Sequence, residues 1–67
     1  MAPKERMAAR LKAIRERRGL TQEQLAEKSG VSRTYLARLE TGRQDPTLST
    51  LEKLAKALGV KVGRLLE

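Results

Sequence analysis

Apolar residues recur along the chain at spacings of three and four, which is the period of a helix with one buried face. The first stripe contains Met7, Leu11 and Ile14 and predicts a helix over about residues 4–18. Gly19 follows its last turn, at the kind of position where a left-handed glycine commonly ends a helix. The segment therefore predicts an amphipathic helix that packs against the rest of the chain.

Two short helices are expected next. Thr21 and Gln24 have the spacing of a capping box, in which each side chain accepts the other residue's backbone N–H. They predict a helix over about residues 22–29, which Gly30 would end. A third helix is expected over about residues 33–40, so that only a tight turn separates the two.

The remaining residues predict a loop and two further helices. Residues 41–46 include Gly, Asp and Pro, which favour a loop. Thr47 is a suitable N-cap for a fourth helix that ends before Gly59, with an apolar stripe formed by Leu48, Leu51, Leu54, Ala55 and Leu58. Apolar residues near the C-terminus predict a last short helical turn. The expected fold class is all-α: one compact domain of four to five helices over residues 1–67, with a short lead at residues 1–3.

The composition agrees with this fold and excludes several functions. Leu and Ala, both strong helix formers, dominate the apolar residues, and Tyr35 is the only aromatic one. The chain has no Cys and no His, which excludes disulfides, thiolate and imidazole metal ligands, and the commonest general base. We therefore expect no metal, no cofactor, no small-molecule ligand and no enzymatic activity. The apolar runs are too short for a membrane span or a signal peptide, which predicts a cytoplasmic protein with no membrane partner.

The charge balance points to an anionic partner. Fifteen Lys and Arg against eight Asp and Glu give a formal net charge of +7. Nucleic acid is the leading candidate for a partner, and the alternative is a solvated surface that keeps the domain soluble. A single aromatic residue disfavours RNA, whose readers stack bases on aromatic side chains.

The predicted third helix has two distinct faces. At about 100° per residue, its apolar side chains gather on one side and leave the other to Arg33, Thr34, Ala37 and Arg38. Arginine can donate two parallel hydrogen bonds to guanine in the major groove, and threonine can contact thymine. The pattern favours a helix that reads DNA bases, and the alternative is an ordinary amphipathic helix with a solvated outer face.

The sequence resembles a known family at this point. Ala26, Gly30 and Leu36 have the spacing of a helix-turn-helix at about residues 21–40. The segments GLTQEQLAEKSGVS and LETGR, with the downstream LAKALGV, resemble the lambda-repressor-like, Cro/XRE-type DNA-binding domain over about residues 7–66. The resemblance implies the same all-helical fold.

The resemblance also implies roles for individual residues. The positions that match base-reading residues are Arg33, Thr34 and Arg38. The positions that match backbone contacts are Thr21, Gln22, Ser32, Tyr35, Thr41 and Arg43. For Thr21 and Ser32 the alternative role is helix capping, for Tyr35 it is cover for the core, and for Arg43 it is a loop position without a partner.

Two further expectations follow from the resemblance. Arg15 and Glu40 match a partly buried ion pair that orients the recognition helix more than it adds net stability. The candidates for a dimer contact are Val60, Val62, Leu65 and Leu66. For Leu65, completion of the monomer's core is an alternative of equal weight.

The function implied is that of a sequence-specific, double-stranded DNA-binding transcriptional regulator. It would bind as a homodimer to a pseudo-palindromic operator, with the helix over residues 33–40 in the major groove. From this sequence we expect neither a long basic N-terminal arm that wraps around the duplex nor a further domain for dimerisation or ligand sensing. The alternative function is a protein-interaction module on the same scaffold, such as an antitoxin-like protein.

Overall fold

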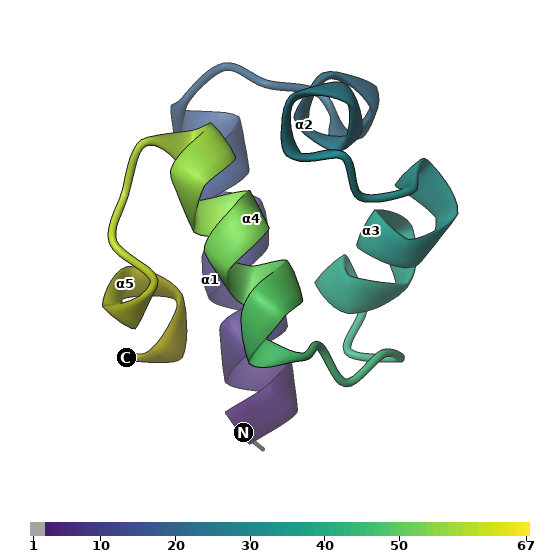
Figure 1. Cartoon of the computed structure of the whole chain (residues 1–67). Helices are drawn as coiled ribbons and strands as arrows, with labels where there is room; N and C mark the ends of the chain where they lie inside the picture. The colour runs from purple at the N-terminus through teal and green to yellow at the C-terminus, as the bar shows by residue number, and fades with distance from the viewer. Residues whose placement is uncertain (1–2) are drawn as a thin grey trace.

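The computed structural model describes residues 3–67 and consists of five helices within that range (Figure 1). The helices are α1 (Pro3–Arg17), α2 (Gln22–Ser29), α3 (Arg33–Glu40), α4 (Leu48–Leu58) and α5 (Gly63–Leu66). The all-α fold class is confirmed, and α2 and α3 occupy the segment predicted to be a helix-turn-helix.

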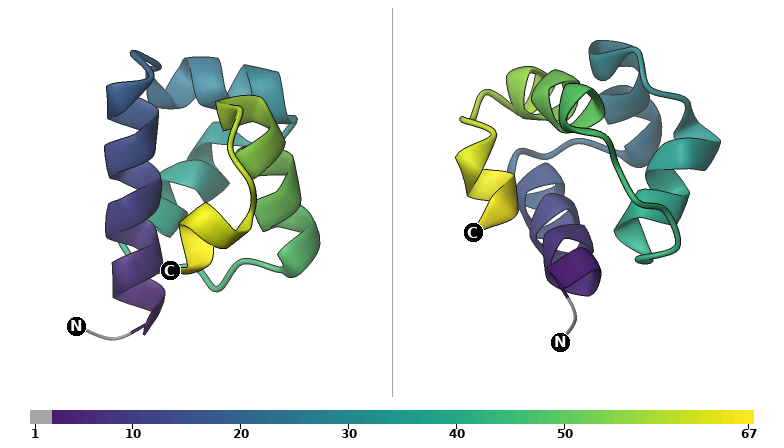
Figure 2. Two further views of the ribbon diagram at one scale, coloured as in Figure 1. Left: turned by 90° about the vertical axis from the view of Figure 1, so that its left-hand side faces the viewer. Right: turned by 60° about the horizontal axis from the view of Figure 1, so that its bottom comes forward.

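The helices surround one core. α2 packs against both α3 and α4, and α1 packs against α3 and α5. The short helix α5 also contacts α4 and lies on the side of the molecule away from α3 (Figures 1 and 2). The outer face of α3 is therefore exposed on one side of the molecule, and the junction of α1 with α5 lies on the opposite side.

Leucine side chains from all five helices meet in the core. The fully buried ones are Leu11, Leu25, Leu36, Leu39, Leu54 and Leu65. Burying a leucine contributes about 1.5–3 kcal/mol before conformational entropy is subtracted. Because every helix contributes at least one such leucine, the core fixes how the five helices pack together.

Local hydrogen bonds set the helix boundaries as the sequence predicts. The Thr21 hydroxyl accepts the Gln24 N–H at 3.0 Å, and the Gln24 side chain accepts the Thr21 N–H at 2.9 Å. The hydroxyl oxygen of Thr47 caps α4 by accepting a backbone N–H at 3.1 Å. Gly30 ends α2 at a φ of 77°, a conformation that side chains with a Cβ rarely adopt.

Two details differ from the prediction. Pro3 already belongs to α1, so the expected lead does not include it, and residues 1–2 lie outside the described residues. Leu48 belongs to the apolar stripe predicted for the fourth helix, but the residue is 59% exposed. As the first residue of α4 it lies one turn before Leu51, beyond the edge of the core.

Candidate nucleic-acid interface

A shallow groove of about 590 Å³ runs over the outer face of α3. The start of α2, α3 itself and the loop after α3 line it with Gln22, Arg33, Thr34, Ala37, Arg38, Thr41 and Arg43. The structure therefore brings together the three predicted base-reading residues and three of the six predicted backbone contacts. Thr21, Ser32 and Tyr35 lie outside the groove lining.

The packing of α3 determines which side chains reach this groove. Leu36 and Leu39 are fully buried against the other helices. Arg33 and Arg38 are consequently exposed on the opposite face. Ala37 is half-buried between them, so no large side chain would keep a ligand away from the helix backbone.

A buried ion pair fixes the end of α3. The Arg15 Nε donates to Glu40 Oε2 at 2.6 Å, and its Nη2 donates to Oε1 at 3.0 Å. The Arg15 side chain is 9% exposed and that of Glu40 is 2% exposed. The pair expected between these residues is thus present, in the two-pronged geometry that favours arginine over lysine.

The same ion pair continues into a wider network. Arg15 Nη1 donates to the Leu20 carbonyl at 2.7 Å, which ties the loop before α2 to α1. The Gln22 side-chain amide donates to Glu40 Oε1 at 3.0 Å. The Glu40 carboxylate therefore joins the start of α2 to the end of α3, and both helices line the groove.

The ion pair also changes the acid–base chemistry of Arg15. The hydrogen bond to Glu40 raises the pKa of the Arg15 guanidinium above its usual value, and the negative charges of Glu40 and Glu16 act in the same direction. Desolvation opposes this rise but is the smaller effect. Arg15 is therefore charged at every pH at which the domain would function.

The predicted backbone contacts include three hydroxyl groups that take part in helix caps. Thr21 caps α2, and the Ser32 hydroxyl accepts the Tyr35 N–H at 3.0 Å at the start of α3. Thr41 donates to the Arg38 carbonyl at 3.1 Å at the end of the same helix. These capping roles are the alternatives that the sequence offered for Thr21 and Ser32. Tyr35 is half-buried and packs against the edge of the core.

One contact at the groove is not predicted by any pattern in the sequence. Arg33 Nη1 lies 3.3 Å from Glu23 Oε2, which links the first turns of α3 and α2. The two side chains are 64% and 70% exposed. An ion pair this exposed contributes little to stability, so it constrains Arg33 only weakly.

The four candidates for a dimer contact have different environments. Leu65 is fully buried in the core, so it cannot contact a partner. The structure therefore favours the alternative role of Leu65, which is to complete the monomer's core. Val60 and Val62 are half-buried and pack against the same core. Of the four, only Leu66 is largely exposed, at 57%.

Two kinds of feature are not found in the described part of the chain. Within residues 3–67 no three acidic side chains lie close enough together to hold a metal ion. No helix in this range is long and apolar enough to cross a membrane. The groove over α3 contains six of the predicted DNA-contacting residues, which makes it the candidate site.

Comparison with known proteins identifies the family. A helix-turn-helix family model matches residues 11–65, which is most of the chain. The immunity repressor protein of Bacillus phage phi105 is 57% identical over 56 residues, which cover 84% of this chain and 39% of the repressor. The chain thus spans about two fifths of the length of this relative.

Solved structures agree in both fold and sequence. The restriction-modification controller protein C.AhdI from Aeromonas hydrophila superposes with a TM-score of 0.89 at 36% identity, covering 91% of this chain and 92% of that one. SinR, a master regulator for biofilm formation, was crystallised in complex with DNA. It superposes with a TM-score of 0.88 at 37% identity, covering 91% of this chain and 98% of that one. The chain therefore belongs to the Cro/XRE-type helix-turn-helix family, and α2 and α3 are its helix-turn-helix.

Proposed function

We propose that this protein is a transcriptional regulator that binds double-stranded DNA at specific sequences, with α3 in the major groove. The observation that carries the proposal is the groove over α3, whose lining includes the exposed residues Arg33, Thr34 and Arg38. A phage repressor among its relatives and a DNA-bound regulator among its structural neighbours support the same function. In this proposal, DNA binding needs no cofactor, small-molecule ligand or catalytic group. The protein would act in the cytoplasm, where the DNA lies.

In this proposal the side chains of α3 divide the recognition of bases among them. Arg33 and Arg38 are the donors for guanine, and Thr34 contacts a base edge or a thymine methyl group. Because Ala37 is small and half-buried, the helix backbone can approach the base edges closely.

The residues around α3 would hold the DNA backbone. Arg43 and Thr41 lie in the loop that follows α3, and Gln22 is in the first turn of α2. The capping oxygens of Thr21 and Ser32 accept backbone N–H groups, which leaves their hydroxyl hydrogens able to donate to phosphate. Helix N-termini also favour phosphate through their free N–H groups and their dipole. Tyr35, half-buried beside the recognition face, would contact a sugar or phosphate with its hydroxyl.

Selection of ligands from a random pool of DNA duplexes tests the proposal. Sequencing the bound fraction should give one enriched motif whose two halves are related by two-fold symmetry. A single half-site would indicate a monomeric reader. Salt-sensitive binding to all sequences, with no enriched motif, would contradict sequence-specific recognition.

We further propose that the protein binds its operator as a homodimer through Leu66, with Val60 and Val62 at the margin of the contact. Leu66 borders a small recess of about 130 Å³ whose lining includes Pro3 and Met7 of α1. Arg6, Leu65 and Glu67 complete the lining, so an exposed leucine can pack there against the apolar side chains of a second copy. Half-sites spaced by about one helical turn, roughly 10 bp, would suit such a dimer.

Leu66→Glu should therefore weaken the dimer, because it would bury a charge in an apolar contact. Binding to a two-half-site operator should fall roughly tenfold or more, while binding to a single half-site should stay within about twofold. Electrophoretic mobility shift on both duplexes and sedimentation velocity measure this. Leu48→Glu is the matched control, since Leu48 is 59% exposed on α4. Equal effects of the two substitutions, or none for Leu66→Glu, would argue against this dimer surface.

A further inference from the structure

Three arginines form a stripe along α1 that the proposed DNA interface does not use. At about 100° per residue, Arg6, Arg10 and Arg17 fall within a sector of about 40°. Glu5 and Glu16, the two acidic residues of α1, lie about 100–120° away from the centre of this sector. One edge of α1 is therefore uniformly positive.

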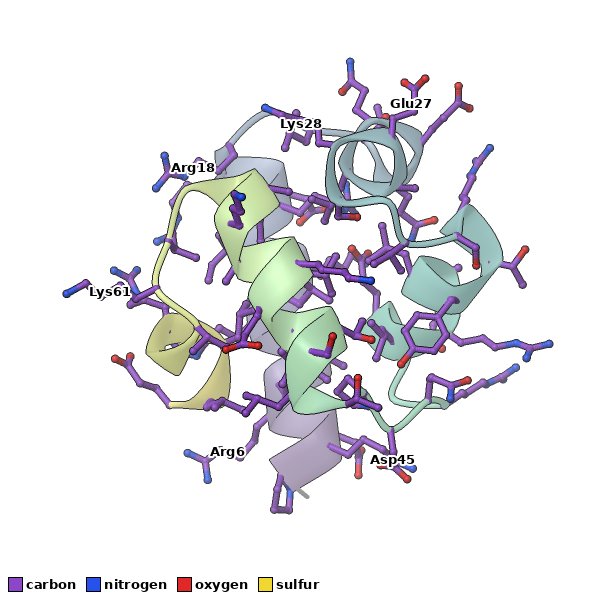
Figure 3. All side chains as sticks on the ribbon, in the orientation of Figure 1. Arg6, Arg18, Glu27, Lys28, Asp45 and Lys61 are labelled. Carbon is purple, nitrogen blue, oxygen red and sulfur yellow. The ribbon has the colours of Figure 1, made fainter. Side chains whose placement is uncertain are left out.

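The stripe borders a groove between α1 and the C-terminal segment. This groove has a volume of about 360 Å³ and is lined by Arg6, Ala9, Arg10, Ala13, Ile14, Arg17, Arg64 and Glu67. We name it the arginine groove. α5 lies across the molecule from α3, so the arginine groove and the groove over α3 face different sides (Figure 2). Arg6 extends from α1 on the side away from Asp45 (Figure 3).

The charges of the arginine groove are not balanced within the described residues. Four arginines line it against one glutamate, and only Arg10 has an acidic partner, with its Nη1 at 3.6 Å from Glu67 Oε2. No carboxylate in residues 3–67 lies within ion-pair distance of Arg6, Arg17 or Arg64. Like charges four residues apart, as at Arg6 and Arg10, destabilise a helix. An anionic ligand would remove this repulsion.

The lining between the arginines favours a protein ligand. Ala9, Ala13 and Ile14 give the groove an apolar part that aliphatic side chains can cover and phosphates cannot. Guanidinium groups pair with carboxylates through two parallel hydrogen bonds. The positive stripe spans three turns of α1, so a partner helix of about three turns could lie along its whole length.

We propose that the arginine groove binds an acidic amphipathic helix of a partner protein. Asp and Glu side chains of that helix pair with the arginines, and its aliphatic side chains cover the alanines. A second copy of this chain is a poor occupant, because two copies that present the same net positive groove to each other repel. Arg6 and Glu67 also line the recess beside Leu66, so a bound helix would meet the edge of the proposed dimer contact. Binding of the acidic helix does not itself require DNA.

A synthetic peptide tests the proposal directly. The probe is a fluorescein-labelled helical peptide of about 15 residues, four turns, with Leu on one face and Glu on both sides of that face. Fluorescence anisotropy should show saturable binding to the full chain. Arg6→Gln combined with Arg17→Gln should weaken binding roughly tenfold, because two carboxylate pairs are lost. This double variant keeps the Arg10–Glu67 pair and the helix propensity of α1.

The matched control removes the same charge elsewhere. Lys53→Gln combined with Lys56→Gln alters exposed residues of α4 and should weaken peptide binding by no more than about twofold. A peptide of the same composition in scrambled order should bind more weakly than the probe. Circular dichroism melting of both variants establishes that they are folded.

Four outcomes would overturn the proposal. These are no binding by the unaltered protein, equal losses for the two double variants, equal binding of the scrambled peptide, and a greater loss of DNA binding for the arginine variant than for the lysine variant on a duplex with a single half-site, where the proposed dimer contact is not needed. The last would mean that the arginine groove contacts a DNA duplex. Failure of DNA recognition itself would leave the peptide results unchanged, so the two proposals can be judged separately.

Discussion

Replacing Glu40 with alanine is expected to lower the free energy of unfolding by about 3 kcal/mol. The Arg15 guanidinium would lose both hydrogen bonds to the carboxylate and remain as a charge in a site where 9% of its side chain is exposed. The Gln22 amide would lose its acceptor as well. Urea unfolding monitored by circular dichroism measures the change. An unfolding midpoint equal to that of the unaltered protein would contradict a structural role for the pair.

Two further variants separate charge from packing. Glu40→Gln keeps an acceptor for Arg15 but removes the negative charge, so it should cost less than Glu40→Ala. Arg15→Met combined with Glu40→Leu removes both charges and should be less destabilising than Glu40→Ala alone, because no buried charge remains unpaired. The Leu20 carbonyl and the Gln22 amide still lose a partner in this double variant, which should leave a residual cost of about 1 kcal/mol.

The effect of pH follows from the raised pKa of Arg15. A basic group whose pKa is higher in the folded state contributes stability that is fully present below its unfolded pKa and is lost as the pH rises through the folded value. The ordinary pKa of arginine is already above about 12. The cost of Glu40→Ala should therefore be the same at about pH 6 and at about pH 9, which unfolding at the two values would check.

The ion pair has a consequence for recognition that stability alone does not measure. Glu40 is the last residue of α3 and accepts from both α1 and α2. Its loss would let the recognition helix change its angle relative to α2. Affinity for the selected operator should consequently fall more than affinity for random duplex, even under conditions where the variant is fully folded.

The features that the sequence predicts well are those that depend on neighbouring residues. A capping box joins residues three apart, so Thr21 and Gln24 identify the start of α2 without knowledge of the fold. The stripe of Leu51, Leu54 and Leu58 likewise defines the buried face of α4, since helical spacing alone places these residues together. The outer face of α3 follows from the same rule.

The sequence predicts less well the features that depend on how the helices pack. Gln22 and Glu40 are eighteen residues apart, and their contact exists only because α2 and α3 converge on Arg15. Leu48 has the right spacing for the buried stripe, but the core ends before it. The arginine groove requires α5 to dock beside α1, which no local pattern specifies.

Arg38→Ala is expected to cost about 1–3 kcal/mol of binding free energy on the selected operator and to relax discrimination at one base pair. Arg38 is exposed on the outer face of α3, and no carboxylate in the described chain is within ion-pair distance of its guanidinium. Arg33, in contrast, has Glu23 at 3.3 Å, which must be displaced before Arg33 can pair with a base. Arg38 is therefore the arginine of α3 that is freest to bind guanine.

Arg43→Ala is the matched control for this prediction, because Arg43 lines the same groove but lies in the loop after α3. A phosphate contact carries no sequence information, so its loss should weaken all duplexes to a similar degree and reduce the log–log salt slope by about one unit. Titrations of each variant against the operator, single-base variants of it and random duplex, at several salt concentrations, separate the two roles.

The two arginines differ in what their loss would reveal about recognition. If Arg38→Ala weakens operator and random duplex equally, its guanidinium binds phosphate, and Arg33 with Thr34 must provide the base contacts. If Arg43→Ala weakens the operator alone, the loop reaches a base edge and α3 lies at a different angle in the major groove than we propose. Because the buried Arg15–Glu40 pair holds α3 in both variants, neither result can be attributed to a displaced recognition helix.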